Sequence, residues 1–270
     1  MRNGKVVLVT GSSRGIGRGV AMGFAKAGYD VAVHYCSARE QGESLCRELE
    51  KMGVRTCLLS GNTGDPEVPG RLVQETIEKL GQLDVLVTNA GIFRDVRLAD
   101  LTPELIDEIY SINFRGMILG ASAAAAYFLE QKIPGSILIN TSVRAFNAHS
   151  GDSIYGGLKA GMNRAIESFA IDLGRHGIRV NGFAPGVINI SCSKEEEAEH
   201  PFYGNTQRYI PMRRNGYVEN IADAVVWLAS DAASYVHGAV IKVDGGLSVV
   251  GAPEDRRDLY DEFDIQGMEG

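Results

Sequence analysis

Short apolar runs alternate with longer stretches whose apolar residues recur at helical spacing along most of the chain. The runs are rich in Val, Ile and Leu, as expected for strands that are buried on both faces. They predict strands over 5–10, 30–35, 55–60, 83–88, 136–142, 178–184 and 239–243. The stretches between them predict helices ending near Ala27, over 40–52, 66–80 and 103–131, around Tyr155, and over 219–230. This alternation predicts an α/β fold: a doubly wound, mainly parallel sheet with helices on both faces.

A glycine-rich turn follows the first predicted strand and opens the first helix. It contains Gly11, Gly15 and Gly17, with Ser13, Arg14 and Ile16 between them. In a strand, turn and helix of this kind, backbone N–H groups at the helix N-terminus bind a pyrophosphate. Any tight connection from a strand to a helix also favours glycine. Its place directly after the first strand nevertheless favours a dinucleotide-binding turn.

The end of the second predicted strand indicates which dinucleotide binds. An acidic residue here would bind the free ribose 2′-hydroxyl of NAD(H), and none is present. Tyr35, Cys36, Ser37 and Arg39 follow instead, and Arg14 lies in the glycine turn. Guanidinium and hydroxyl groups suit a 2′-phosphate, so the sequence favours NADP(H). If both arginines are ordinary surface charges, NAD(H) or dual use is the alternative.

Polar and small residues follow the third and fourth predicted strands. Asn62 and Thr63 come after the third strand, where they are predicted to contact the adenine side of the cofactor. Asn89, Ala90 and Gly91 come after the fourth. Small residues there leave room for a cofactor close to the backbone, although Gly91 is also compatible with a simple turn. Parallel strands end at one edge of the sheet, so these residues are expected to share a site.

Tyr155 and Lys159 form the strongest candidate for chemistry. They stand four residues apart at the start of a predicted helix, so both side chains leave the same face. A phenol has a pKa of about 10, and a nearby ammonium group is expected to lower it toward working pH. Ser142, at the end of a predicted strand, can hold a substrate oxygen beside the phenol. The alternative is a purely structural role, in which Tyr155 is a half-buried aromatic residue and Lys159 is a solvated charge.

Asn113 lies within the long predicted helix over 103–131. A buried Asn must have its amide satisfied, so one interpretation is a purely structural residue that binds the backbone. The functional interpretation is that Asn113 holds a water that feeds protons to Lys159.

Composition excludes several classes of function. The chain has 270 residues, of which 44% are hydrophobic and 23% charged, so one globular domain over 1–270 is enough. The net charge of −7 argues against nucleic-acid binding. No signal-peptide core and no long uninterrupted apolar segment is evident, so we expect a soluble cytoplasmic protein without membrane contact. Cys36, Cys46, Cys57 and Cys192 lack metal-ligand or redox spacing, and no metal is predicted.

The ordered motifs resemble those of the short-chain dehydrogenase/reductases over about residues 4–247. The matching positions are Thr10-Gly11-x3-Gly15-x-Gly17, Asn89-Ala90-Gly91, Asn113, Ser142, Tyr155-x3-Lys159, Pro185-Gly186 and Asp244-Gly245-Gly246. The resemblance implies a seven-stranded Rossmann sheet and a catalytic tetrad of Asn113, Ser142, Tyr155 and Lys159. It implies that Tyr155 is the acid or base, that Ser142 orients and polarises the carbonyl and that Lys159 binds the nicotinamide ribose. Pro185, Gly186 and Ile188 are expected beside the nicotinamide.

Three positions depart from the usual family pattern. Asn62 stands where Asp is frequent, and Cys36 where Thr or Ser more often binds the 2′-phosphate. Ile190 replaces the Thr that commonly binds the carboxamide, with Ser191 next to it as a substitute. None of these departures touches the tetrad.

The stretch over about 191–215 is expected to form a lid over the substrate. Ser142, Arg144, Tyr155, Phe202 and Tyr203 are the predicted substrate contacts, with simple lid packing as the alternative for the two aromatic residues of the lid. The predicted reaction interconverts a secondary alcohol and a ketone, with a steroid, sugar or secondary metabolite as substrate. A 3-oxoacyl-carrier-protein reductase is the alternative, and a catalytically idle binding or assembly protein is the alternative of another class.

Residues 248–270 extend past the usual end of the family. The extension is acidic with interspersed aromatic residues, and is interpreted either as a frayed tail or as a segment that docks on a neighbouring subunit. The resemblance implies a homotetramer, with a homodimer as the alternative. Trp227 in the last predicted helix is interpreted as a core residue.

Overall fold

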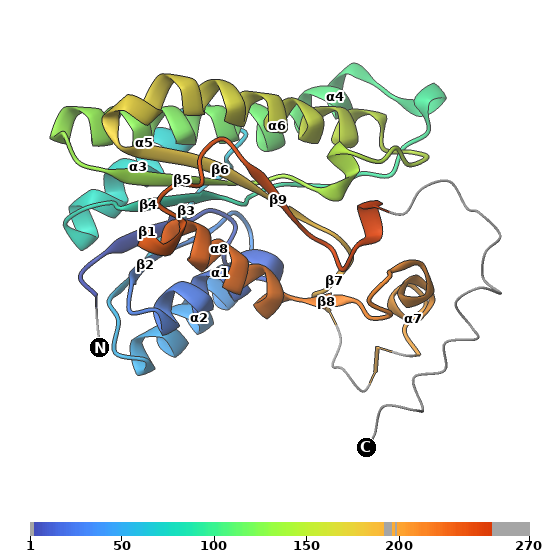
Figure 1. Ribbon diagram of the computed structural model, residues 1–270, viewed down its shortest axis with the longest axis horizontal. Helices are drawn as coiled ribbons and strands as arrows, with labels where there is room; N and C mark the ends of the chain where they lie inside the picture. Colours follow the sequence, from blue (N-terminus) through green and yellow to red (C-terminus); the bar gives the residue numbers. More distant parts are fainter. Residues whose placement is uncertain (1–2, 192–195, 198, 250–270) are drawn as a thin grey trace.

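The computed structural model describes residues 3–191, 196–197 and 199–249. Within these residues, seven parallel strands form one sheet (Figure 1). In spatial order they are β3 (Thr56–Ser60), β2 (Asp30–Tyr35), β1 (Val6–Val9), β4 (Val85–Thr88), β5 (Gly135–Asn140), β6 (Ile178–Pro185) and β9 (Val240–Val243). This order confirms the predicted α/β Rossmann fold. Each predicted strand is present, with ends that differ by one or two residues.

Helices cover both faces of the sheet (Figure 1). One layer contains α1 (Gly15–Lys26), α2 (Arg39–Lys51) and α8 (Val218–Ala229). The other contains α3 (Glu67–Leu80), α4 (Pro103–Tyr110), α5 (Gly116–Gln131) and α6 (Ser153–Leu173). Short 3-10 turns lie at Leu98–Asp100, Val143–Ala145, Gly174–His176, Gln207–Tyr209, Asp231–Ala233 and Leu247–Val249. Beside the main sheet, β7 (Ile188–Asn189) and β8 (Gly216–Tyr217) form a parallel pair next to α7 (Tyr203–Thr206).

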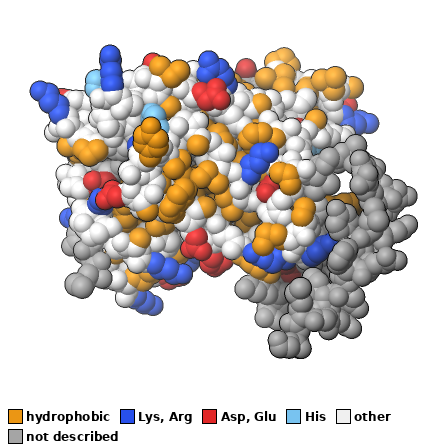
Figure 2. Space-filling view, viewed as in Figure 1, with side chains coloured by type: hydrophobic (Ala, Val, Ile, Leu, Met, Phe, Trp, Pro, Cys, Tyr) orange, Lys and Arg blue, Asp and Glu red, His pale blue; other side chains and the backbone are white. Residues whose placement is uncertain are grey.

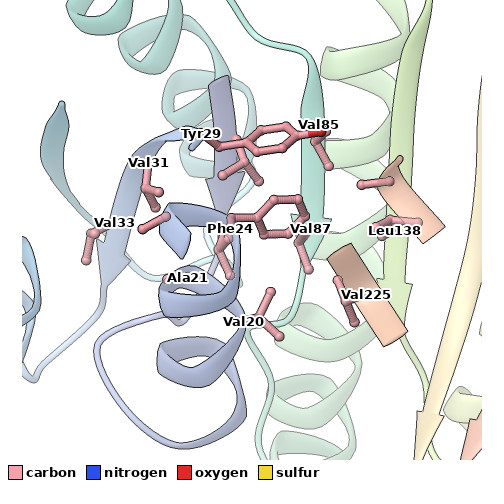
Figure 3. Packing of buried hydrophobic residues seen from close by; sticks show 14 of the residues in the cluster. Val20, Ala21, Phe24, Tyr29, Val31, Val33, Val85, Val87, Leu138 and Val225 are labelled. Atoms are coloured by element: carbon pink, nitrogen blue, oxygen red, sulfur yellow. The ribbon is translucent and has the colours of Figure 1, made fainter. Parts of the chain in front are cut away.

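Two hydrophobic cores lie on opposite faces of the sheet because neighbouring strand residues point in opposite directions. In β1, Val7 and Val9 join the core under α1 and α8, whereas Val6 and Leu8 join the core under α3, α5 and α6. Figure 3 shows Phe24 of α1 lying against β4 at the centre of the first core. The near-continuous apolar character of the strands is thus required by burial on both faces.

The predicted long helix over 103–131 is interrupted. A π-helical segment, Ser111–Arg115, separates α4 from α5, and Asn113 lies within it. Pro103–Gln131 is also long and apolar enough to cross a membrane, with a mean hydropathy of 1.2, and 44% of that window is buried in the structure. A core helix passes the same test, and Met117, Ala121, Ala124 and Phe128 of α5 are buried against the sheet.

Trp227 is a correction to the sequence interpretation. Its neighbours in α8, Val225 and Leu228, are fully buried, but the Trp227 side chain is 42% exposed. The helical period places it at the border of the buried face, so it belongs to the surface of this chain.

Candidate functional site

A cleft of about 690 Å³ opens at the carboxyl ends of the strands. It lies where the strand order reverses, because β1 pairs with β2 on one side and with β4 on the other. Such a switch point leaves a crevice that ligands occupy in open α/β sheets. Most of the predicted cofactor residues line it: Gly11, Ser13, Arg14, Gly15, Ile16, Gly17, Cys36, Ser37, Asn62, Thr63, Asn89, Ala90, Gly91, Tyr155, Lys159, Pro185 and Gly186.

The glycine turn needs glycine for defined steric reasons. Gly11 has φ +64°, and a Cβ there would lie 2.9 Å from the Ala90 Cα. A Cβ on Gly17 would overlap the Asn89 side chain and the Gly11 carbonyl oxygen. Asn89 Nδ2 donates to the Thr10 carbonyl oxygen at 2.9 Å, which ties the turn to the end of β4. The turn therefore brings bare backbone to the cleft at the start of α1, as a pyrophosphate requires.

His34 of β2 fixes this turn, and the sequence interpretation missed it. The Gly11 N–H donates to His34 Nδ1 at 2.8 Å, and Nε2 lies 3.0 Å from the Gly61 carbonyl oxygen. Because Nδ1 accepts, the imidazole is neutral and donates from Nε2. Burial lowers the pKa of His34 to about 4. A His inside an otherwise apolar strand was the only sequence signal for this role.

The buried His34 is expected to make stability depend on pH. Unfolded His binds a proton below about pH 6.5, whereas the folded residue resists protonation until about pH 4. The contribution of His34 to the free energy of unfolding is therefore complete above pH 6.5. As the pH falls toward 4, the free energy of unfolding decreases by about 3 kcal/mol. Denaturant unfolding across this range should show that loss in the wild-type protein and a smaller one in His34→Asn. Parallel curves for the two proteins would contradict the assignment.

The predicted 2′-phosphate residues divide into two groups. Arg14, Cys36 and Ser37 line the cleft, but Tyr35 and Arg39 do not. Tyr35 packs against Gly42 of α2, and Arg39 Nε donates to Glu43 Oε1 at 2.8 Å on the exposed face of that helix. Arg39 is the first residue of α2, so its side chain reaches the Glu43 side chain one helical turn later rather than the cleft. Of the two arginines, Arg14, at the N-cap of α1, is therefore the one that lines the cleft.

Tyr155, Lys159 and Ser142 meet in the same cleft. Tyr155 and Lys159 share one face of α6, and Lys159 Nζ lies 5.5 Å from the centre of the Tyr155 ring. Lys159 Nζ donates to the Asn140 carbonyl oxygen at 2.6 Å. Ser142 lies just after β5 and hydrogen-bonds the phenol. The structure thus brings together the tyrosine, the lysine and the serine that the sequence predicted to share one site.

The electrostatics differ from the expectation that Lys159 lowers the pKa of Tyr155. Burial raises the pKa of Tyr155, opposed by the hydrogen bond from Ser142 and by the charge of Arg144, while Asp152 adds to the rise. Burial also lowers the pKa of Lys159 to about 7, because its ammonium group is desolvated. Without bound cofactor, Lys159 is therefore only partly charged near neutral pH. A partly charged ammonium group lowers the pKa of the phenol less than a fully charged one would.

Asn113 does not line the cleft but holds a loop that does. Its Oδ1 accepts from the Ile92 N–H at 2.8 Å and its Nδ2 donates to the Ile92 carbonyl oxygen at 2.8 Å. Ile92 and Phe93 line the cleft directly after β4. The π-helical segment thus presents the Asn113 amide to this loop. The structural interpretation of Asn113 accounts for these contacts, and a water relay to Lys159 stays a prediction.

The remaining predicted contacts lie around the cleft rather than on its lining. Arg144 pairs with Asp152, and Phe202 is exposed with its edge toward Tyr203. Tyr203 is buried, and its hydroxyl accepts from the Ile190 N–H at 3.3 Å. Ile188 packs into the core, so Ile190 and Ser191 line the cleft in its place. The lining residues that the sequence did not predict as contacts are His34, Ala38, Ile92, Phe93, Ile112, Asn140 and Thr141.

A buried carboxylate anchors the described part of the predicted lid. Glu197 accepts hydrogen bonds from Asn189 at 2.8 Å, Asn215 at 2.6 Å and Gln207 at 3.1 Å. Burial would raise the pKa of Glu197, but these hydrogen bonds outweigh it and lower the pKa. Residues 192–195 and 198 of the predicted lid, and residues 250–270 of the predicted C-terminal extension, lie outside the described residues.

Comparison with known proteins gives consistent matches over nearly the whole chain. A family model described as enoyl-(acyl carrier protein) reductase matches residues 11–248. L-rhamnose 1-dehydrogenase (NAD(P)(+)) of Sphingomonas is 36% identical over 91% of this chain and 97% of that protein. The 3-oxoacyl-[acyl-carrier-protein] reductase FabG of Staphylococcus aureus is 36% identical over 92% of this chain and 99% of that protein.

The structural match is equally extensive. A short chain dehydrogenase from Burkholderia cenocepacia, solved in complex with NADP, superposes with a TM-score of 0.83 at 30% sequence identity. The superposition covers 90% of this chain and 98% of that chain. The sheet and the cleft at its carboxyl edge therefore follow a known architecture.

Proposed function

Because the chain belongs to the short-chain dehydrogenase/reductase family and is an NAD(P)-dependent alcohol dehydrogenase or ketoreductase, we propose that it uses NADP(H) and Tyr155 to interconvert a secondary alcohol and a ketone. One observation carries the proposal: Tyr155, Ser142 and Lys159 face the same cleft as the glycine turn. A cofactor bound by that turn and a substrate beside the phenol would then lie in the same cleft.

The cleft fits a dinucleotide, because the glycine turn leaves no room for a side chain at Gly11 or Gly17. When bound, the nicotinamide supplies or accepts the hydride. In the reducing direction, the Tyr155 hydroxyl donates its proton to the carbonyl oxygen, and in the oxidising direction the phenolate removes it. Ser142 orients that oxygen through its hydroxyl. Lys159, held by Asn140, supports the charge that develops on the phenol.

The proposal includes a preference for NADP(H) over NAD(H). The position of Arg14 in the cleft supports this preference. We expect Arg14→Gln to weaken NADP(H) binding about 10- to 100-fold, because charge-assisted hydrogen bonds contribute about 1.5–3 kcal/mol. Binding of NAD(H) should change little. Arg39→Gln is the matched control, since Arg39 pairs with Glu43 away from the cleft. Fluorescence titration of both reduced cofactors measures these affinities, and equal losses in the two variants would contradict the role of Arg14.

The substrate is proposed to be an alcohol or ketone of moderate size, such as a steroid, a sugar or a secondary metabolite. A second candidate is 3-oxoacyl-carrier-protein reduction, supported by the similarity to FabG over nearly its full length. The net charge of −7 opposes docking of an acidic carrier. Similar enzymes that reduce carrier-bound ketoacyl groups use basic residues near the end of the long helix and after the Tyr155 helix. This chain has Lys132 and Ile133 at the first place and Arg175 and His176 at the second, so such a basic patch would be incomplete.

The experiment that tests the proposal follows absorbance of reduced nicotinamide with a panel of alcohols and ketones, including sugars, steroids and acetoacetyl-carrier protein. We expect turnover of small-molecule secondary alcohols or their ketones, faster with NADP(H) than with NAD(H). Turnover restricted to the carrier-bound substrate would establish the second candidate. Cofactor binding without turnover of any substrate would instead favour the idle binding or assembly protein.

We also propose a homotetramer, with a homodimer as the alternative. Hydrophobic side chains gather over α8 and β9 on the face shown in Figure 2. Trp227 and Tyr235 are exposed in this region, and Leu129 and Ile171 are exposed on α5 and α6. Exposed apolar surface of this kind is typical of subunit contacts. Analytical ultracentrifugation should give an assembly of four or two chains, and a monomer at micromolar concentration would contradict the proposal.

A further inference from the structure

Arg144 makes three contacts that link separate parts of the cleft. Its backbone N–H donates to Ser142 Oγ at 3.2 Å. Its Nη1 donates to Asp152 Oδ2 at 2.9 Å. Its guanidinium carbon lies 4.7 Å from the centre of the Phe93 ring. Arg144 therefore contacts the segment that bears the serine, the start of the helix that bears the tyrosine, and the loop after β4.

Asp152 extends this link into α6. The residue is 4% exposed and precedes the helix, where its carbonyl oxygen accepts from the Gly156 N–H at 2.7 Å. A Cβ on Gly156 would lie 2.7 Å from Asp152 Oδ1, so the carboxylate packs over the residue that follows Tyr155. An ion pair with one partner so fully buried holds a single geometry more firmly than an exposed pair does.

Phe93 connects Arg144 to the phenol itself. Its ring meets the Tyr155 ring edge to face, with centres 5.1 Å apart and planes at 81°. Phe93 is also part of the cleft lining, whereas Arg144 and Asp152 are not. The guanidinium thus supports the Phe93 ring through a cation–π contact. Arg144 therefore reaches the cleft lining through Phe93 and Ser142.

The charged groups around the phenol come from several elements. Arg144 and Asp152 act on Tyr155 with opposite signs, and Lys159 lies on the same helix. In the loop after β4, Arg94 pairs with Glu108 at 3.3 Å, and Asp95 lies against Gly151. The two members of the Arg144–Asp152 pair are therefore the charges whose removal should move the titration of the phenol in opposite directions.

We propose that Arg144 is a positioning residue: its backbone N–H holds the Ser142 hydroxyl, and its guanidinium group, through Asp152 and Phe93, holds the Tyr155 phenol beside that hydroxyl and balances the charge there. The inference rests on the proposed function, because it gives the ion pair a role in the same reaction. This role agrees with the position of Arg144, which follows Ser142 by two residues but does not line the cleft.

The test compares the pH dependence of kcat and KM in four proteins: wild type, Arg144→Met, Asp152→Asn and Arg144→Lys. In alcohol oxidation the basic form of Tyr155 is active, so the rate rises with pH through its titration. Arg144→Met should move that rise to higher pH by about half a unit to one unit, and Asp152→Asn should move it to lower pH by a similar amount. Arg144→Lys keeps the charge and should restore the wild-type midpoint while kcat stays reduced.

Opposite shifts establish the inference, whereas any other pair of results, including a shift in one variant alone, overturns it. If Arg144→Met does not fold, Arg144→Gln removes the same charge and takes its place in the comparison. Should the wild-type protein turn over no substrate, the proposed function fails separately. The inference is then decided by ultraviolet difference titration of the phenol, with Tyr155→Phe as the blank, where the same opposite shifts are expected.

Discussion

Tyr155→Phe is expected to lower kcat/KM by about 10²- to 10⁴-fold, the usual contribution of a general acid or base. The substitution removes only the hydroxyl and keeps the ring that packs against Phe93. Cofactor affinity and stability should therefore stay close to wild type. Steady-state rates with the best substrate of the panel, together with titration of reduced cofactor, measure the two effects separately.

The control for Tyr155→Phe is Tyr110→Phe, which removes a hydroxyl from an exposed tyrosine of α4 that does not line the cleft. That variant should retain wild-type kcat/KM. If Tyr155→Phe also retains its turnover, the phenol is not the proton donor and the proposed mechanism is wrong. If both variants lose activity together, the cause is structural and lies outside the chemistry of Tyr155.

Gly17→Ala is expected to damage both folding and cofactor binding. The new methyl group would overlap the Asn89 amide and the Gly11 carbonyl oxygen, so the turn or the end of β4 must move. Overpacking of this kind costs about 1–3 kcal/mol. Because the same backbone presents its N–H groups to the cofactor, affinity for NADP(H) should fall more than about 10-fold, equivalent to 1.4 kcal/mol. Denaturant unfolding and cofactor titration check the two losses.

Gly70→Ala is the matched control for this substitution. Gly70 lies within α3, and a Cβ there would meet no atom within 4 Å. Alanine should therefore stabilise the helix by roughly 0.5–1 kcal/mol and leave cofactor binding unchanged. A Gly17→Ala protein with wild-type stability and affinity would show that the turn adjusts without strain, and the close packing inferred for it would be wrong.

Arg14 and Arg39, both predicted to bind the 2′-phosphate, show how much a local sequence pattern can predict. Arg14 and Arg39 are equivalent in the sequence, since both lie near the end of a strand that borders the cleft. In the structure one lines the cleft and the other pairs with Glu43. Residue type and spacing predict where a segment lies, but the direction of a long flexible side chain depends on the partners that surround it.

The electrostatics of Tyr155 and Lys159 were less predictable still. The sequence provides only the ordinary pKa of a phenol and the charge of a neighbouring lysine. Burial changes both groups, because it raises the pKa of Tyr155 and lowers that of Lys159 to about 7. Desolvation depends on every atom packed around a group, and spacing along one helix contains no information about it.

The sequence by itself determined the features that are local in the chain. Apolar runs and helical periodicity specified the order of strands and helices, the glycines specified the turn after β1, and a four-residue spacing placed Tyr155 and Lys159 on one face. Tertiary structure alone decided three hydrogen-bonded pairs: Gly11 with His34, Ile92 with Asn113, and Arg144 with Asp152. Hydrogen bonds of this kind depend on distances between side chains from different elements, and only packing of the whole chain sets those distances.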